Sequence, residues 1–175
     1  ISKAFCDSIR YSKEGELAAV ASRSSKNLKY FSDKYGVETF DSYDAILNDS
    51  SIDAIYIGTP HNSHFDLSLK TLRCGKHLLC EKPMTMNYTE AMILIEAARK
   101  NGYTILLTAD HGNAELMRNK DGSPHTYHTT NLVPFIIFSE NNYSPKDGKL
   151  GDIAPTVLKI MGVDIPNEMS ANVLI

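Results

Sequence analysis

Short apolar segments rich in β-branched residues alternate with helical segments along this chain of 175 residues, and this alternation constrains its fold most. Segments typical of strands lie at Leu17–Ala21, Val37–Phe40, Ile52–Ile57, His77–Cys80, Tyr103–Leu107 and Val133–Phe138. Helical patterns occupy residues 1–10, 26–34, 44–47, 63–74, 88–100 and 153–161. Because parallel strands are joined through helical crossovers, the pattern predicts an α/β fold with a mostly parallel sheet and helices on both faces.

Charge and hydropathy exclude two classes of partner. The net charge is -3, the pI is near 6.1, and no Lys/Arg-rich run is present, so we expect no nucleic-acid binding. No apolar run approaches the roughly 20 residues of a membrane helix, so we expect no membrane partner. The three cysteines lack paired short spacings, which favours free thiols and a cytoplasmic location.

Polar motifs follow three predicted strands in the first part of the chain. They are Ala21-Ser-Arg-Ser24, Gly58-Thr-Pro-His-Asn-Ser-His64 and Cys80-Glu-Lys-Pro83. With these motifs, residues 1 to about 102 resemble the N-terminal NAD(P)-binding domain of the Gfo/Idh/MocA oxidoreductases, in particular the dihydrodiol dehydrogenase-like branch. The resemblance implies a Rossmann-like sheet and a nicotinamide dinucleotide bound at its edge.

The same resemblance implies roles for individual residues. The implied cofactor-binding residues are Ser22, Arg23, Thr59, Pro60, His64 and Glu81. Arg23 would face the adenosine ribose, where its planar donor fork suits the 2′-phosphate of NADP. Lys82 would lie beside the nicotinamide and the substrate as the catalytic residue. The alternatives are a solvated surface cation for Arg23, a helix-start residue for His64 and an exposed loop lysine for Lys82.

The chain also departs from this family. Dinucleotide binding uses a first strand and a glycine-rich turn, whose N–H groups meet the pyrophosphate. No glycine precedes Gly15 here, and the family's substrate domain has no counterpart. We therefore expect NADP to be poorly held and the oxidoreductase reaction not to proceed.

A second group of chemistry-bearing residues follows the strand predicted at Tyr103–Leu107. It comprises Thr108-Ala-Asp110-His111-Gly-Asn-Ala-Glu115 and, at the end of the loop 112–131, His125-Thr-Tyr-His128. A carboxylate and an imidazole at a strand end, with a second imidazole returning on a loop, suit Mn²⁺ or Zn²⁺. The alternatives are a hydrogen-bonded strand end and a loop histidine satisfied by backbone. We expect His125 to face solvent.

Residues from about 103 to 175 resemble the C-terminal part of the cofactor-independent phosphoglycerate mutases, which belong to the alkaline phosphatase superfamily. Asp152-Ile-Ala-Pro155-Thr156 adds to this resemblance. It implies that Asp110 and His111 serve one metal and His128 another, as in a two-metal phosphoryl-transfer site. The nucleophilic serine and the other ligands of that family have no counterpart here, so we expect weak metal binding.

These resemblances predict two joined fragments, residues 1–102 and 103–175, in one continuous α/β domain. The helix over 88–100, its stop at Gly102 and the following strand satisfy the local rules of both families, so we place the junction there. The expected protein is a recombined or engineered chimera without a complete active site. Open alternatives are an NAD(P)-dependent oxidoreductase, a metal-dependent phosphoglycerate mutase or phosphatase, and a homo-oligomer formed through an exposed sheet edge.

Overall fold

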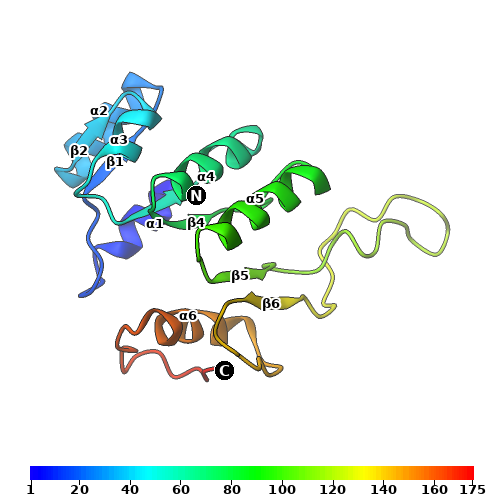
Figure 1. Ribbon diagram of the computed structural model, residues 1–175. Helices are drawn as coiled ribbons and strands as arrows, with labels where there is room; N and C mark the ends of the chain where they lie inside the picture. The colour runs from blue at the N-terminus through cyan, green and yellow to red at the C-terminus, as the bar shows by residue number, and fades with distance from the viewer. The chain divides into compact units, whose positions relative to one another are not determined.

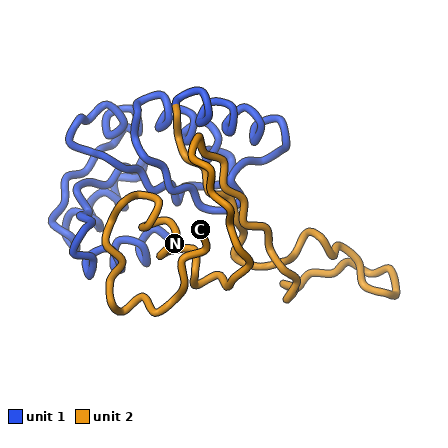
Figure 2. Tube along the Cα trace, turned by 60° about the horizontal axis from the view of Figure 1, so that its bottom comes forward, with its two compact units in different colours: residues 1–101 blue, residues 102–175 orange.

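A computed structural model describes all residues from Ile1 to Ile175. It divides into two compact units, unit 1 (Ile1–Asn101) and unit 2 (Gly102–Ile175), which Figure 2 shows in different colours. None of the helices combines the length and the hydrophobicity that crossing a bilayer requires. The single continuous domain expected from the sequence stays a prediction.

Unit 1 alternates helices with short strands (Figure 1). Its elements are α1 (Ser2–Ile9), β1 (Ala19–Ala21), α2 (Ser25–Tyr35), β2 (Glu38–Phe40), α3 (Tyr43–Asn48), β3 (Ala54–Ile57), the 3-10 helix η1 (His61–Ser63), α4 (His64–Arg73), β4 (His77–Cys80) and α5 (Tyr88–Lys100). β1 pairs with β2 and β3 pairs with β4, both in parallel. The predicted Rossmann-like α/β fold is confirmed, because helices join each pair of parallel strands.

Sequence signals at the helix ends explain these bounds. Asn87 caps α5 by accepting a hydrogen bond from the Glu90 N–H at 2.9 Å. The Glu90 carboxylate accepts in return from the Met86 N–H at 3.0 Å, so the N–H groups of both Met86 and Glu90 have side-chain acceptors. α2 ends at Gly36, whose φ of 67° lies in the left-handed region that glycine adopts without strain.

α4 packs against β3, β4 and α5 through a face that carries polar side chains. His64, Ser68 and Thr71 lie at helical spacing on that face, and all three are fully buried. Buried polar groups need hydrogen-bond partners, and the Thr71 hydroxyl donates to the Leu67 carbonyl at 2.8 Å. The polar partners of His64 lie at the ends of β3 and β4, so this face helps to hold the candidate site.

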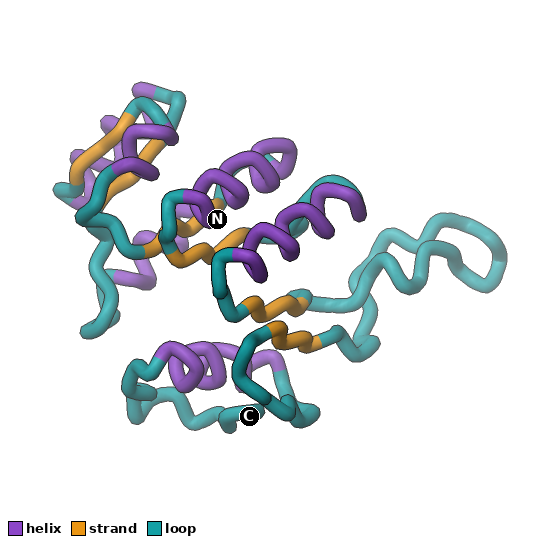
Figure 3. The backbone as a smooth tube through the Cα atoms, viewed as in Figure 1, coloured by secondary structure: helices purple, strands orange, loops and turns teal.

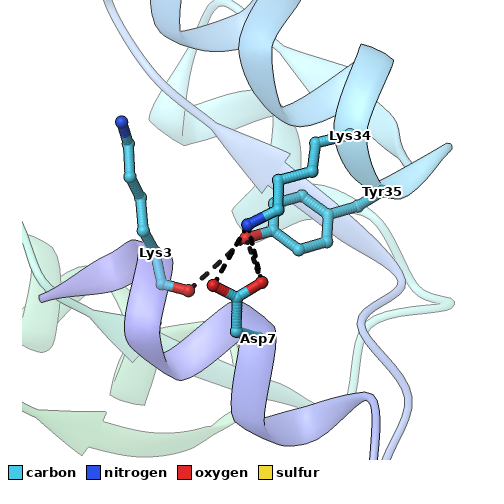
Figure 4. Close-up of polar contacts among 4 residues, drawn as sticks. All are labelled: Lys3, Asp7, Lys34 and Tyr35. Carbon is cyan, nitrogen blue, oxygen red and sulfur yellow. Dashed lines mark hydrogen bonds and ion pairs between the residues drawn. The ribbon is translucent and has the colours of Figure 1, made fainter.

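A polar cluster joins α1 to α2 (Figure 4). The Lys34 ammonium donates to the two Asp7 carboxylate oxygens at 2.7 and 3.0 Å, and the Tyr35 hydroxyl donates to Asp7 at 3.0 Å. Tyr35 also lies 3.4 Å from the Lys3 carbonyl. The Lys34 hydrogen bond is the main reason why the pKa of Asp7 is lowered. These contacts fix the orientation of α1, and with it the position of its N-terminus.

Unit 2 contains one strand pair and one α-helix, with loops making up most of the rest (Figure 3). Its elements are β5 (Ile105–Thr108), β6 (Phe135–Phe138), the 3-10 helix η2 (Leu150–Asp152) and α6 (Ile153–Met161). β5 and β6 pair antiparallel, in contrast to the parallel strands of unit 1. A loop rather than a helix connects them, and parallel neighbours need a crossover, so the return direction of the chain decides the pairing.

The C-terminal residues are tied to α6 by buried polar groups. The Asp152 carboxylate accepts from the Lys149 N–H at 2.8 Å and the Asn172 N–H at 2.9 Å. These two bonds hold the pKa of Asp152 below its usual range. The Thr156 hydroxyl donates to the Asp152 carbonyl at 2.6 Å and accepts from the Leu174 N–H at 3.0 Å.

Candidate functional site

The N-terminus of α1 lies at the carboxyl end of β3. The Ser2 hydroxyl donates to the Gly58 carbonyl at 3.3 Å, and the Phe5 ring stacks on the Tyr56 ring with centroids 3.9 Å apart. A side chain at Gly58 would meet the Ser2 hydroxyl at 2.6 Å, so glycine permits this close approach. No side chain caps the first turn of α1, whose N–H groups carry the positive end of the helix dipole.

Tyr56 also holds the first residue after β4. Its hydroxyl donates to the Glu81 carboxylate at 2.7 Å. Burial raises the pKa of Tyr56, and the bond to Glu81 raises it further. The hydroxyl therefore stays protonated and remains a donor, which anchors Glu81 beside β3.

His64 joins the segments that follow β3 and β4. Its Nδ1 lies 2.8 Å from the Pro83 carbonyl oxygen, and its Nε2 lies 2.9 Å from the Thr59 carbonyl oxygen. The residue is completely buried, so it contacts the site from within the protein. The resemblance suggested a side chain that lines the cleft; the geometry instead gives His64 contacts to the backbone of the segments beside it.

The other predicted site residues, including the predicted catalytic Lys82, lie in the segments that follow the strands. Arg23, just after β1, is exposed, and its guanidinium lies 5.9 Å from the centroid of the Tyr43 ring on α3. The Ser22 hydroxyl accepts from the Ser24 N–H at 3.2 Å within the same turn. The Thr59 hydroxyl accepts from the Ser63 hydroxyl at 2.8 Å. Pro60 and Lys82 are exposed, and the peptide bond between Lys82 and Pro83 is cis.

In unit 2 the predicted metal-binding residues lie close together. Asp110 is half exposed, and its Oδ1 lies 3.5 Å from the Nε2 of His111. The His111 ring stacks on the His128 ring, with centroids 3.5 Å apart and planes 16° from parallel. His111 Nε2 is buried and has no hydrogen-bond partner. The structure thus brings together all three residues, although no group of three or more His, Cys, Asp or Glu side chains is arranged to hold a metal ion.

Glu115 organises the base of the loop that carries His128. Its carboxylate accepts from the Asn113 N–H at 2.7 Å, from the Asn131 amide at 3.0 Å and from the Thr129 hydroxyl. These bonds, led by that from Thr129, lower the pKa of Glu115 to about 2. The Thr129 N–H donates to the Gly112 carbonyl at 2.8 Å and closes the loop. The motif contained Glu115, but no local pattern indicated that its carboxylate would bond to residues beyond His128.

His125 and the cysteines show no ligand arrangement. The His125 ring contacts the Tyr127 ring edge to face, with centroids 6.1 Å apart, and its side chain is half-buried rather than fully exposed. Cys6, Cys74 and Cys80 are all free. Burial raises the pKa of Cys6 and of Cys80, which keeps these two thiols protonated and poor as metal ligands.

Two family models match the chain. The model described as the oxidoreductase family with an NAD-binding Rossmann fold matches residues 1–109. The model of the metalloenzyme superfamily matches residues 91–165. The two matches overlap over 91–109, which contains most of α5, Gly102 and β5. This segment therefore fits both families, as the local sequence pattern predicted.

The individual relatives also fall into two groups, phosphoglycerate mutases and reductases. A 2,3-bisphosphoglycerate-independent phosphoglycerate mutase of Salinibacter ruber is 53% identical over 83 residues, which is 47% of this chain and 16% of the mutase. The structure of the 3-ketoreductase KijD10 from Actinomadura kijaniata, in complex with NADP and TDP-benzene, is 32% identical with a TM-score of 0.54. Biliverdin reductase from Synechocystis sp. PCC 6803, in complex with biliverdin and NADP+, is 28% identical with a TM-score of 0.56.

These relatives are much longer than the segments they share with the chain. The 3-ketoreductase match covers 58% of this chain and 31% of that protein, and the biliverdin reductase match covers 58% and 32%. The chain thus spans about a sixth to a third of its relatives' lengths. It combines an oxidoreductase part with a metalloenzyme part.

Proposed function

Because the chain belongs to the oxidoreductase family with an NAD-binding Rossmann fold, we propose that unit 1 binds a nicotinamide dinucleotide, NADP(H). The carboxyl ends of β3 and β4, together with the N-terminus of α1, would form the site. In open α/β folds, ligands bind at the carboxyl ends of the strands.

The position of α1 carries this proposal. Its first turn lies against Gly58 at the end of β3 and has no side-chain cap. Such a helix N-terminus offers backbone N–H groups and positive charge to a phosphate. Bound dinucleotide would supply a hydride-transfer centre, with Lys82 and the anchored Glu81 beside the nicotinamide and Ser22, Thr59 and Pro60 along the cofactor.

Arg23 supports NADP(H) over NAD(H). It is exposed after β1 and lies over the Tyr43 ring, so its planar fork can donate two parallel hydrogen bonds to a phosphate. We predict that Arg23→Ala weakens NADPH binding about tenfold, which corresponds to about 1.4 kcal/mol, and leaves NADH binding nearly unchanged. Titration with fluorescence detection measures both affinities.

Arg73→Ala is the matched control, since Arg73 is an exposed arginine in the last turn of α4. It should change neither affinity. Equal losses for NADPH and NADH in Arg23→Ala would show that Arg23 acts through folding rather than through the 2′-phosphate. Absence of binding of both dinucleotides to the wild-type chain would refute the proposed function.

We propose further that the chain is a chimera, natural or engineered, that turns over neither parent reaction. A metalloenzyme-type segment follows unit 1 directly, where an oxidoreductase would continue into its substrate domain. On the metalloenzyme side, Asp110, His111 and His128 would have to act without a serine nucleophile from the mutase pattern. Assays with NADPH and a panel of carbonyl compounds, and with a generic phosphate ester and Mn²⁺, test this; turnover in either assay contradicts it.

A second candidate function is weak divalent-metal binding in unit 2. The buried Nε2 of His111 has no hydrogen-bond partner and lies 3.5 Å from Asp110 Oδ1, which favours a ligand between or beside them. The stacked ring of His128 would have to turn to add a third donor. A bound Mn²⁺ or Zn²⁺ would supply Lewis-acid stabilisation of a phosphoryl oxygen.

We predict that the double variant Asp110→Asn/His111→Ala binds Mn²⁺ and Zn²⁺ at least about tenfold more weakly than the wild type, because two donors are lost. Isothermal titration calorimetry measures the difference. His77→Ala is the control, since His77 is an exposed histidine in β4 of unit 1. Equal affinities in the double variant and the wild type would refute the proposed metal site.

A further inference from the structure

We infer that Tyr56 is a positioning residue of the proposed dinucleotide site. Its hydroxyl holds one oxygen of the Glu81 carboxylate, so that the other oxygen can accept a hydrogen bond from a donor group on the nicotinamide riboside of the bound cofactor. The inference rests on the proposed function, because it assigns a role within that same site. The sequence motifs assigned no role to Tyr56.

The alternation of side chains along the strands places Tyr56 and Glu81 on one face of the sheet. Tyr56 pairs with Leu79 in the register of β3 and β4, and the Glu81 N–H continues the ladder by donating to the Ile57 carbonyl at 3.0 Å. Since side chains two positions apart point to the same side of a strand, Glu81 lies on the same side as Leu79. It is therefore diagonal to Tyr56, and the tyrosine hydroxyl spans the gap with a bond of 2.7 Å.

The Tyr56 ring also contacts the other half of the proposed site. It stacks on the Phe5 ring of α1, with centroids 3.9 Å apart and planes 5° from parallel. The first turn of the same helix meets Gly58 through the Ser2 hydroxyl. A side chain at Gly58 would come within 3.0 Å of the Tyr56 ring, so glycine leaves room for the ring. Tyr56 thus contacts both the helix that we assign to the phosphates and the carboxylate that we assign to the nicotinamide.

The hydrogen bond from Tyr56 restricts the Glu81 side chain. Bonds to a charged acceptor are short and strong, so this bond limits the rotation of a long and otherwise flexible side chain. The hydroxyl stays a donor, because burial and the bond to the neighbouring carboxylate raise the pKa of Tyr56. A side chain that is held in place before the ligand arrives loses less conformational entropy on binding. The bond should therefore increase the affinity for a ligand that contacts Glu81.

The remaining carboxylate oxygen decides which ligand group Glu81 can meet. Tyr56 bonds to Oε1, which leaves the lone pairs of Oε2 as acceptors. An acceptor recognises N–H and O–H groups. Nicotinamide riboside carries both kinds of donor, in its carboxamide and in its ribose hydroxyls.

A double-mutant cycle on the full chain tests this role. NADH is the probe, and fluorescence titration measures its affinity for the wild type, Tyr56→Phe, Glu81→Ala and the double variant. We expect Tyr56→Phe, which keeps the stack on Phe5, to weaken binding about fivefold. In the Glu81→Ala background the same change should have no further effect, because a positioning residue acts through the group that it holds. Tyr11→Phe removes the hydroxyl of an exposed tyrosine and is the control, which should bind NADH as the wild type does.

Nuclear magnetic resonance on the free chain gives a readout that does not depend on affinity. In Tyr56→Phe we expect the side-chain carboxyl signal of Glu81 to shift, because the carboxylate loses its donor. The amide signals of α1 should stay in place, since the ring still stacks on Phe5. An unchanged Glu81 signal would show that the hydroxyl does not hold the carboxylate, and it would overturn the inference.

The binding results separate this inference from the proposed function. If the wild type binds neither NADH nor NADPH, the proposed function fails and the role of Tyr56 fails with it. If the wild type and Tyr56→Phe bind NADH equally well, the proposed function stands and the inference is refuted. Equal losses from Tyr56→Phe with and without the Glu81 side chain would also refute the inference, because Tyr56 would then act through packing of the strand.

Discussion

Thr156→Val is expected to lower the free energy of unfolding by about 1–3 kcal/mol, because a buried N–H loses its acceptor. The hydroxyl of Thr156 accepts from the Leu174 N–H at 3.0 Å and donates to the Asp152 carbonyl at 2.6 Å. Valine keeps the shape of the side chain, but it offers neither bond. Since Thr156 and Leu174 are buried, water cannot replace the lost partner. Urea unfolding followed by circular dichroism measures the change.

Thr156→Ser is the matched control, because serine retains the hydroxyl and should keep both bonds. Hydrogen exchange should show the loss of protection in Thr156→Val at the Leu174 amide and its neighbours. Equal stability of the valine variant and the wild type would mean that the C-terminal residues are not held to α6 in this way. Any loss in the serine variant would measure the packing of the threonine methyl group, which serine lacks and valine retains.

Gly112→Ala is expected to open the base of the loop that carries His128. A methyl group at Gly112 would lie 2.2 Å from the Thr129 hydroxyl oxygen and 2.5 Å from the Glu115 carboxylate oxygen, so these groups must move. Both atoms end side chains at the surface of the loop, so we expect them to turn away, to lose their hydrogen bonds and to lower the melting temperature. Gly151→Ala is the control, because a methyl group there meets no atom within 4 Å. Thermal unfolding compares the two variants with the wild type.

The pKa of Glu115 reports directly on this opening. In the wild type it is lowered from 4.5 to about 2 by bonds that Gly112 permits. Because the folded value is lowered, the contribution of Glu115 to stability is complete above about pH 4.5 and is lost as the pH falls toward about 2. In Gly112→Ala the pKa should move up toward 4.5, and this acid dependence should shrink. A pKa that stays near 2 in the variant, measured by carboxyl chemical shifts, would contradict the steric account.

Local sequence signals predicted much of the secondary structure. The helices over 88–100 and 153–161 and the strand over 77–80 have the bounds of α5, α6 and β4. Their limits depend on neighbouring residues, such as the cap at Asn87 and the left-handed Gly162 after α6, and such residues can be read along the chain. The antiparallel pairing of β5 with β6 was not predicted, because a strand's direction depends on how its connection returns.

Only some of the residues in the candidate sites could be predicted from the sequence. Asp110, His111 and His128 could be selected because a strand end and a loop were predicted to present them, and the structure places them together. The anchoring of Glu81 by Tyr56 could not be selected, because the two residues meet only across neighbouring strands. The hydrogen bond between Asn131 and Glu115 could not be predicted either, because it forms only once the loop between the two residues closes.

The order of residues alone determined the type of the main helices and strands, the α/β class of unit 1 and the presence of parts from two families. These properties depend on periodicity, caps and motifs, which act over a few positions. Only the tertiary structure decided that His64 faces two carbonyl oxygens, that the rings of His111 and His128 stack, and that Thr156 holds Leu174. Each of these contacts joins positions whose distance in space depends on chain direction and packing, and none of the three can be read from the local pattern of residues.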